Sequence, residues 1–357
     1  MKIGKISPTI WNRSVKKKVH ISQTDGSFSW ADASVCGDHA GIGYYAVLGA
    51  AGELASCKIR AEGISVRILF PETADEDFLA AVCEEIQKGC ERIGAKVTSL
   101  SAEGTAVVQS PVVYASAAGT TVQNPGMYAP VGETEVQHSG MYTSVGETEV
   151  QHSGMYTSVE RTAGGKKENM QRSVKNRELL LCGYAGLEGS LRILESAEEE
   201  LSQRFISTFL VQAKRLRDQL VMPEQILAAA KGRYTVIRQI GSGGILAALW
   251  EMSEEEQIGF EIAMGAISLK QETVEICEYY RLNPYQMTSA GSYLILTDEA
   301  DRVIEVLEKS GARAVRLGVA KAQNARVITS RDEVRYLDRP APDELARWQK
   351  EHKKHGE

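Results

Sequence analysis

The chain has 357 residues, of which 43% are hydrophobic and 25% charged, and its formal net charge is −6 at pH 7. This length predicts roughly two domains that each bury a core. The negative charge excludes a global positive field of the kind that attracts nucleic acid or an anionic membrane. No run approaches the roughly 20 apolar residues that span a bilayer, and the six cysteines contain no Cys-x-x-Cys pair. We therefore expect a cytoplasmic protein with reduced thiols and with neither a nucleic-acid partner nor a membrane.

Hydrophobic periodicity predicts helices and strands in alternation along most of the chain. Before residue 120, it predicts helices over 44–57 and 75–93 and strands over 63–71, 94–97 and 111–115. After residue 174, it predicts helices over 198–220, 222–230, 245–257, 299–310 and 342–354, strands over 179–181, 234–237, 292–297 and 314–319, and a closing hairpin over 326–337. The alternation is typical of an α/β (α+β) fold.

A tandem repeat separates the two halves of the chain. Residues 126–139 read GMYAPVGETEVQHS, residues 140–153 read GMYTSVGETEVQHS, and a third copy begins at 154. Each unit has two glycines and no amphipathic stripe, and its period is shorter than that of solenoid repeats. We therefore predict a flexible low-complexity insert at 120–174. It would divide an N-terminal domain at 1–119 from a C-terminal domain at 175–340, with an exposed terminal helix at 341–357.

A glycine turn leads directly into an apolar helical run at 238–250, which reads RQIGSGGILAALW. Such a turn begins many phosphate sites, because backbone N–H groups at a helix start bind anions. The same glycines also permit close packing of a helix on a strand. A nucleotide site normally adds an acid or a lysine beside the turn, and this chain has Gln239 and Ser242 there. The pattern leaves both interpretations open, a phosphate turn and a packing turn.

Several stretches match one known superfamily. They are 1–7 (MKIGKIS), 45–55 (YAVLGAAGELA), 185–190 (AGLEGS), 243–252 (GGILAALWEM), 271–277 (QETVEIC), 283–285 (NPY) and 289–292 (SAGS). Through them the chain resembles the AIR synthase (PurM) superfamily, and in particular the AIR-synthase-related proteins near the hydrogenase maturation factor HypE. The resemblance covers nearly everything except the repeats and the end of the chain.

This resemblance implies a two-domain, PurM-like architecture in which the N-terminal α/β domains form the interface of a homodimer. It also implies that ATP and Mg²⁺ bind in a cleft near that interface. Members of the superfamily typically phosphorylate an amide or carbonyl oxygen, which converts that oxygen into a leaving group. Such chemistry needs glycine turns that admit phosphates and carboxylates that hold the metal.

Three acids match family positions that the resemblance assigns to the metal. Asp32 falls at the acid of the family's Thr-Asp-Pro, Glu53 at the acid of Asn-Asp-Leu-Ala, and Glu103 at the acid of Gly-His-Thr-Glu-Val. The resemblance implies that these carboxylates could hold Mg²⁺. The alternative, that they are three ordinary surface acids, stays open.

The glycine turn departs from the family pattern His-Asp-x-Thr-Glu-Gly-Gly. Here both acids are lost while the glycines remain. The residues left to bind ATP are Arg238, Gly241, Gly243 and Gly244, with Asp38 in a displaced copy of the family's Gly-Glu/Asp-Asp-Ala loop. No catalytic residue is assigned. Two hypotheses follow: a protein with an eroded ATP and Mg²⁺ site that acts by binding a ligand or partner, or a divergent ATP-dependent enzyme that phosphorylates an amide or carbonyl oxygen of a small substrate.

Overall fold

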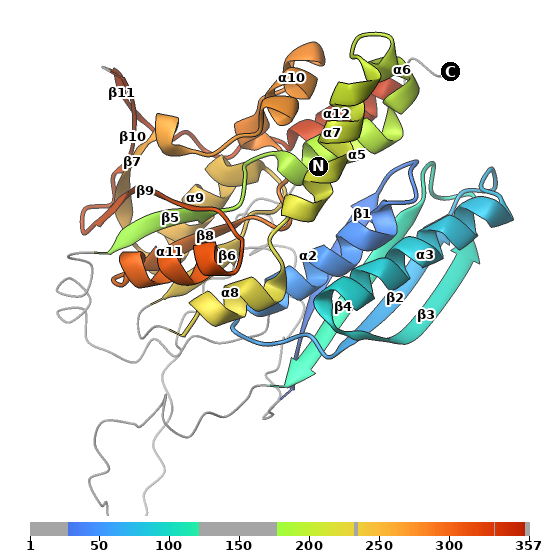
Figure 1. Ribbon diagram of the computed structural model, residues 1–357, viewed down its shortest axis with the longest axis horizontal. Helices are drawn as coiled ribbons and strands as arrows, with labels where there is room; N and C mark the ends of the chain where they lie inside the picture. The colour runs from blue at the N-terminus through green and yellow to red at the C-terminus, as the bar shows by residue number, and fades with distance from the viewer. Residues whose placement is uncertain (1–27, 121–176, 232–234, 332, 354–357) are drawn as a thin grey trace, which may run out of the picture.

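The computed structural model describes residues 28–120, 177–231, 235–331 and 333–353. These residues form a four-stranded sheet in the N-terminal part and a seven-stranded sheet in the C-terminal part, each covered by helices (Figure 1). The fold is therefore mixed α/β, as expected from the sequence. The predicted flexible insert lies outside the described residues, apart from its first residue.

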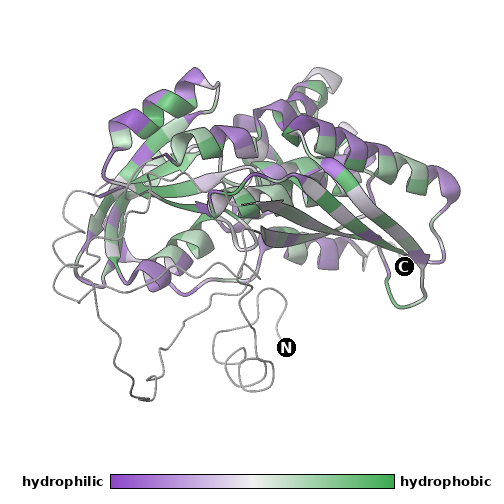
Figure 2. Ribbon diagram, turned by 90° about the horizontal axis from the view of Figure 1, so that it is seen from below, coloured by the Kyte–Doolittle hydropathy of each residue, from purple (hydrophilic) through white to green (hydrophobic). Residues whose placement is uncertain are grey.

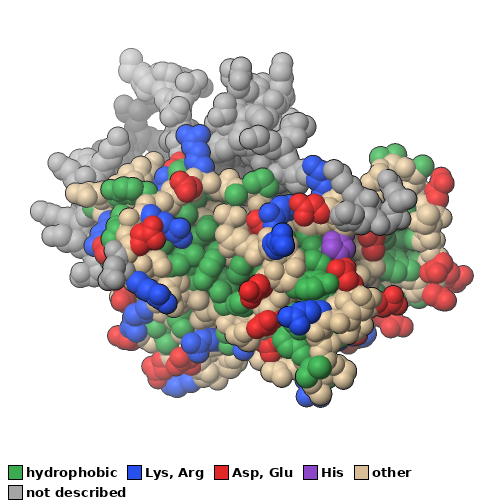
Figure 3. Space-filling model, turned by 90° about the horizontal axis from the view of Figure 1, so that it is seen from above, with side chains coloured by type: hydrophobic (Ala, Val, Ile, Leu, Met, Phe, Trp, Pro, Cys, Tyr) green, Lys and Arg blue, Asp and Glu red, His purple; other side chains and the backbone are tan. Residues whose placement is uncertain are grey.

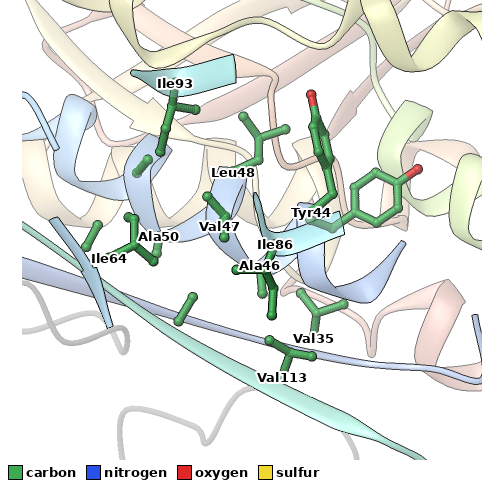
Figure 4. Packing of buried hydrophobic residues seen from close by; sticks show 14 of the residues in the cluster. Val35, Tyr44, Ala46, Val47, Leu48, Ala50, Ile64, Ile86, Ile93 and Val113 are labelled. Atoms are coloured by element: carbon green, nitrogen blue, oxygen red, sulfur yellow. The ribbon is translucent and has the colours of Figure 1, made fainter. Parts of the chain in front are cut away.

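The N-terminal sheet has the strand order β1-β4-β2-β3. Its strands are β1 (Phe28–Cys36), β2 (Gly63–Phe70), β3 (Lys96–Gly104) and β4 (Val112–Thr120). The β4 strand pairs antiparallel with both β1 and β2, and β3 pairs parallel with β2. Helices α2 (Ile42–Ser56) and α3 (Glu76–Ile93) pack together over one face of this sheet. The core lies between the sheet and the two helices, as Figure 4 shows for Val35 and Val113 from the strands and Val47 from α2.

Local sequence explains both helices. The Asp75 side chain accepts the N–H of Phe78 and caps the start of α3, and Gly94 ends the helix in the left-handed conformation. Helix α2 is apolar on nearly all sides, and all of its residues except Glu53 are buried. A helix that is apolar all round must be covered on all sides. Accordingly α2 contacts the N-terminal sheet on one side and the C-terminal elements α8 and β6 on the other.

The C-terminal sheet has the strand order β11-β10-β7-β9-β5-β8-β6. Its strands are β5 (Glu178–Cys182), β6 (Val236–Gln239), β7 (Gly259–Ala263), β8 (Tyr293–Thr297), β9 (Ala314–Lys321), β10 (Arg326–Ser330) and β11 (Glu333–Tyr336). Its helices are α5 (Leu187–Ser196), α6 (Glu198–Ser202), α7 (Ser207–Arg215), α8 (Pro223–Ala229), α9 (Gly244–Glu256), α10 (Gln271–Tyr279), α11 (Ala300–Lys309) and α12 (Glu344–Lys353), with short 3₁₀ turns η2 (Leu216–Gln219), η3 (Met264–Ala266) and η4 (Pro284–Gln286).

Both faces of this sheet are buried around its central strand β5. Along β5, Leu179 and Leu181 join the apolar cluster that contains α9, whereas Leu180 and Cys182 join the cluster that contains α8 and α11. A strand covered on two faces carries a continuous apolar run, as β5 does. The covering helices carry polar residues on their outer sides, which Figure 2 shows as alternating hydropathy along each helix.

Two predictions about helices were wrong. The helix expected over 198–220 is broken into α6, α7 and η2, because Ile206 adopts an extended conformation with ψ of 152°. The terminal helix α12 forms, but one of its sides is buried rather than exposed. Leu345 is 3% and Trp348 is 6% exposed, because they pack with α5, α7 and α10 in one apolar cluster. Within the described residues, no helix is both long and apolar enough to cross a membrane.

Candidate functional site

The glycine turn lies between the end of β6 and the start of α9. Gly243 and Gly244 have φ of 86° and 67°, a left-handed conformation that favours glycine. A Cβ atom on Gly244 would lie 2.5 Å from the carbonyl oxygen of Tyr285 and 2.7 Å from the backbone nitrogen of Met287. Gly244 is therefore needed for close packing of α9 on the segment around η4. This geometry supports the packing interpretation of the turn.

A carboxylate already accepts a hydrogen bond from one backbone N–H group of the turn, that of Gly243. The backbone nitrogen of Gly243 donates to Oδ2 of Asp343 over 2.6 Å, and Oδ1 of Asp343 accepts the N–H of Leu345 over 2.9 Å at the start of α12. Asp343 is 4% exposed. Burial raises the pKa of the Asp343 carboxyl group to about 6, although the hydrogen bonds from Gly243 and Leu345 oppose that shift. Asp343 thus connects the first turns of two helices.

Gln239, which the resemblance aligns with an acid, joins the two parts of the chain. Its side chain is buried, and Nε2 donates to the carbonyl oxygen of Gly49 over 2.9 Å and to Oε1 of Glu53 over 3.2 Å. Its backbone nitrogen also donates to Oγ of Ser56 over 3.0 Å. A Cβ atom on Gly52 would lie 1.9 Å from Oε1 of Gln239. The amide therefore fills the space beside α2 and holds β6 against that helix.

Arg238 forms ion pairs inside its own domain. Its Nη1 lies 2.9 Å from Oε2 of Glu251, and its Nη2 pairs with Glu255, one turn further along α9. The Arg238 side chain is 19% exposed. Burial lowers its pKa, but Glu255 and Glu251 more than compensate, so the pKa is raised overall. The guanidinium group is thus held by two carboxylates, and contacting a phosphate would require it to leave them.

The three predicted metal residues lie apart. Asp32 accepts a hydrogen bond from Ser116 on the face of the N-terminal sheet opposite α2, and Glu103 pairs with Arg67 over 2.8 Å at the edge of the sheet. Glu53 lies on α2, on the other side of the sheet. Among the residues that the structure describes, no three His, Cys, Asp or Glu side chains form a group that could hold a metal ion. The assignment of these three carboxylates to Mg²⁺ stays a prediction.

Asp38, predicted to contact the nucleotide, is exposed in the loop between β1 and α2. The next residue, His39, is 6% exposed, and its Nδ1 lies 2.8 Å from Oε2 of Glu195 on α5. Tyr45 donates to Oε1 of Glu195 over 2.7 Å. Burial raises the pKa of Glu195, but the contacts with His39 and Tyr45 outweigh it and lower the pKa overall. Sequence reasoning missed this buried group, because Glu195 lies 150 residues from Tyr45 in the chain.

A second buried charge group, also missed, lies next to the glycine turn. Nη1 of Arg192 donates to Oε1 of Glu188 over 2.9 Å, and these side chains are 8% and 2% exposed. Nη2 of Arg192 donates to the carbonyl oxygen of Cys36 over 2.8 Å. Both residues also interact electrostatically with Asp343. The signal in the sequence is two opposite charges at i and i+4 among the apolar residues Leu187, Leu191 and Ile193 of helix α5.

The junction, as we call Cys36, Glu188, Arg192, Gly243 and Asp343 together, connects four segments. It brings together the end of β1, helix α5, the glycine turn and the start of α12. Helix α12 makes a further contact, since Nε2 of Gln349 donates to the carbonyl oxygen of Cys36 over 2.9 Å. The junction therefore lies where the N-terminal and C-terminal parts of the chain meet.

Comparison with known proteins identifies the C-terminal part by sequence. Residues 178–330 match the family described as AIR synthase related protein, C-terminal domain. The chain is 27% identical over 129 residues to the carbamoyl dehydratase HypE of Rhizobium leguminosarum bv. viciae, a match that spans 34% of this chain and 37% of that protein.

Solved structures show the same fold over nearly the whole chain. HypE in a crystal structure of the HypE–HypF complex is 15% identical, with a TM-score of 0.63 over 89% of this chain and 92% of that chain. A crystal structure of the hydrogenase maturation protein HypE in complex with ATP is 15% identical, with a TM-score of 0.59 over 92% of this chain and 90% of that chain. Residues 178–330 thus match the AIR-synthase-related C-terminal domain by sequence, and the chain as a whole shares the fold of these HypE structures.

Proposed function

We propose that this chain is a cytoplasmic HypE-like homodimer with an eroded site for ATP and Mg²⁺, and that it acts by binding a ligand or a partner. The observation that carries the proposal is the Gln239 side chain. It stands where the family pattern has an acid, and its amide hydrogen bonds to Gly49 and Glu53. Mg²⁺ requires oxygen ligands and is commonly bound through carboxylates. An amide N–H directed at the Glu53 carboxylate satisfies that carboxylate without a metal.

Two neighbours of Gln239 support the same conclusion. Ser242 replaces the second acid of the family pattern, and Arg238 is paired with Glu251 and Glu255 rather than directed into open space. The alternative is an ATP-dependent enzyme that phosphorylates an amide or carbonyl oxygen. The observation that favours it is the fold shared with a HypE solved in complex with ATP. The two functions differ in how strongly nucleotide binding depends on Mg²⁺.

Titration of the full chain with ATP, with and without Mg²⁺, is expected to give a Kd well above micromolar and only a small effect of Mg²⁺. Without the lost carboxylates, the metal has too few ligands to screen the triphosphate. Calorimetry measures both constants, and hydrolysis is expected near background. Arg238→Ala is expected to change the affinity little. Tight binding that strictly requires Mg²⁺ would refute the eroded site and favour the enzyme.

The proposed dimer interface is the face of the N-terminal sheet opposite α2. This face presents Trp30, which is 38% exposed, and Tyr114, which is 53% exposed, on the neighbouring strands β1 and β4. Large exposed apolar side chains on a sheet are typical of interaction surfaces.

On the face seen in Figure 3, acidic and basic side chains are interspersed, which supports the expectation of no nucleic-acid partner.

Light scattering at micromolar concentration is expected to give twice the chain mass of 39.0 kDa. Tyr114→Arg is expected to yield a monomer, because it places a charge at the centre of the interface. The matched control is Tyr336→Arg on strand β11, where the tyrosine is 72% exposed and far from the proposed interface. A monomeric wild type, or equal effects of both substitutions, would contradict the proposal.

A further inference from the structure

We propose that the Asp343 carboxylate occupies the anion-binding position at the start of α9, so that the C-terminal helix α12 excludes phosphate groups from the glycine turn. This inference rests on the proposed function, because it takes the turn as the place where a phosphate would bind. It adds an autoinhibitory contact within the chain to the loss of the family acids.

The geometry supports this assignment. Helix α9 has 13 residues, and the first N–H groups of a helix have no partner within it and attract anions. The Gly243 N–H has its partner in Asp343, which comes from 100 residues further along the chain. The 2.6 Å distance between the Gly243 nitrogen and Oδ2 of Asp343 is that of a short, charge-assisted hydrogen bond. A phosphate oxygen on this N–H would have to displace the carboxylate.

The carboxylate is held in place by the helix that it caps. Oδ1 of Asp343 accepts the N–H groups of Leu345 and Ala346, and the apolar side of α12 packs Leu345 and Trp348 into the core. Gln349 attaches the middle of the helix to Cys36. Asp343 can therefore leave the turn only if the first turn of α12 rearranges.

The charges around Asp343 make the anion-binding position at the start of α9 unfavourable for a second anion. Glu188 and Arg192 face it from α5, and they offset each other as an ion pair. Glu344 follows Asp343 on α12, and its nearest cation is Arg347, 2.7 Å away. An ionised Asp343 thus leaves one uncompensated negative charge beside Gly243. Because burial raises the pKa of Asp343 to about 6, protonation in mildly acidic solution removes this charge.

The test compares wild type with Asp343→Asn in the full-length chain. Asparagine has nearly the same shape and is a good helix N-cap, so α12 keeps its start. The matched control is Asp338→Asn, an exposed acid a few residues earlier. ATP binding is measured by calorimetry at pH 7.5. Asp343→Asn is expected to bind ATP about tenfold more tightly than wild type, since it removes a like charge next to the phosphate. Asp338→Asn is expected to match wild type.

A second measurement changes the charge of Asp343 by varying the pH. Sulfate keeps its charge between pH 5 and pH 8, so its binding, followed by the NMR shift of the Gly243 amide, reports only on the protein. In wild type, sulfate affinity is expected to rise as the pH falls through about 6, and in Asp343→Asn it is expected to change little.

The outcomes separate the two proposals. If wild type binds ATP but Asp343→Asn binds it no better and sulfate affinity does not depend on pH, the inference is overturned and the proposed function stands. If Asp343→Asn binds and wild type does not, both are supported. If neither protein binds ATP or sulfate at Gly243, the turn is not an anion site, and the inference fails together with ligand binding at that site.

Discussion

Arg192→Met is expected to lower the free energy of unfolding by about 4 kcal/mol, because it leaves a buried carboxylate without its partner. Glu188 is 1% exposed, and Arg192 supplies its counter-charge at 2.9 Å. The same substitution removes the hydrogen bond to the carbonyl oxygen of Cys36, which joins α5 to the end of β1. Methionine keeps most of the aliphatic volume, so a cavity contributes little. Urea unfolding followed by circular dichroism measures the change.

The control is a double-mutant cycle with Glu188→Gln. If the uncompensated charge is the cause, Arg192→Met costs about 2 kcal/mol less in the Glu188→Gln background than in wild type. Equal costs in the two backgrounds would show that Arg192 acts through Cys36 or through packing alone. The comparison is valid only where the dependence on urea is the same for all variants.

Much of the fold could be predicted from periodicity. Helix α3, strand β2, the hairpin β10–β11 and the β8–α11–β9 unit lie where the sequence predicted them, because each combines a clear apolar period with a capping or turn residue. The β1 strand could not be predicted in this way. It reads FSWADASVC, with small and polar residues, and it is a strand because it pairs with β4 along its whole length. Tertiary pairing decides such a segment, whatever its local preference.

The candidate site was harder to predict, because the role of each residue in it depends on which other residues it contacts. The glycine turn was recognised from the sequence, but Asp343 was assigned to an exposed helix. Only the burial of Leu345 and Trp348 places Asp343 against Gly243. Arg238 was assigned to phosphate from its charge, whereas the structure pairs it with Glu251 and Glu255 on the following helix. Residue type indicated the chemistry in both cases, and packing decided which partner was available.

Gly244→Ala is expected to lower the free energy of unfolding by about 3 kcal/mol or more, which would show that packing requires this glycine. Two effects add. At φ of 67°, alanine costs about 1 kcal/mol in backbone strain. In addition, its Cβ would meet the backbone of Tyr285 and Met287 at 2.5–2.7 Å, where no flexible side chain can move away. The matched control is Gly94→Ala, since Gly94 has φ of 71° with nothing within 4 Å of an added Cβ. It should show the strain alone, about 1 kcal/mol. Urea unfolding of both variants separates strain from contact. If the two alanines cost the same, the backbone at 284–287 gives way easily, and the glycine turn then has no packing reason to keep Gly244.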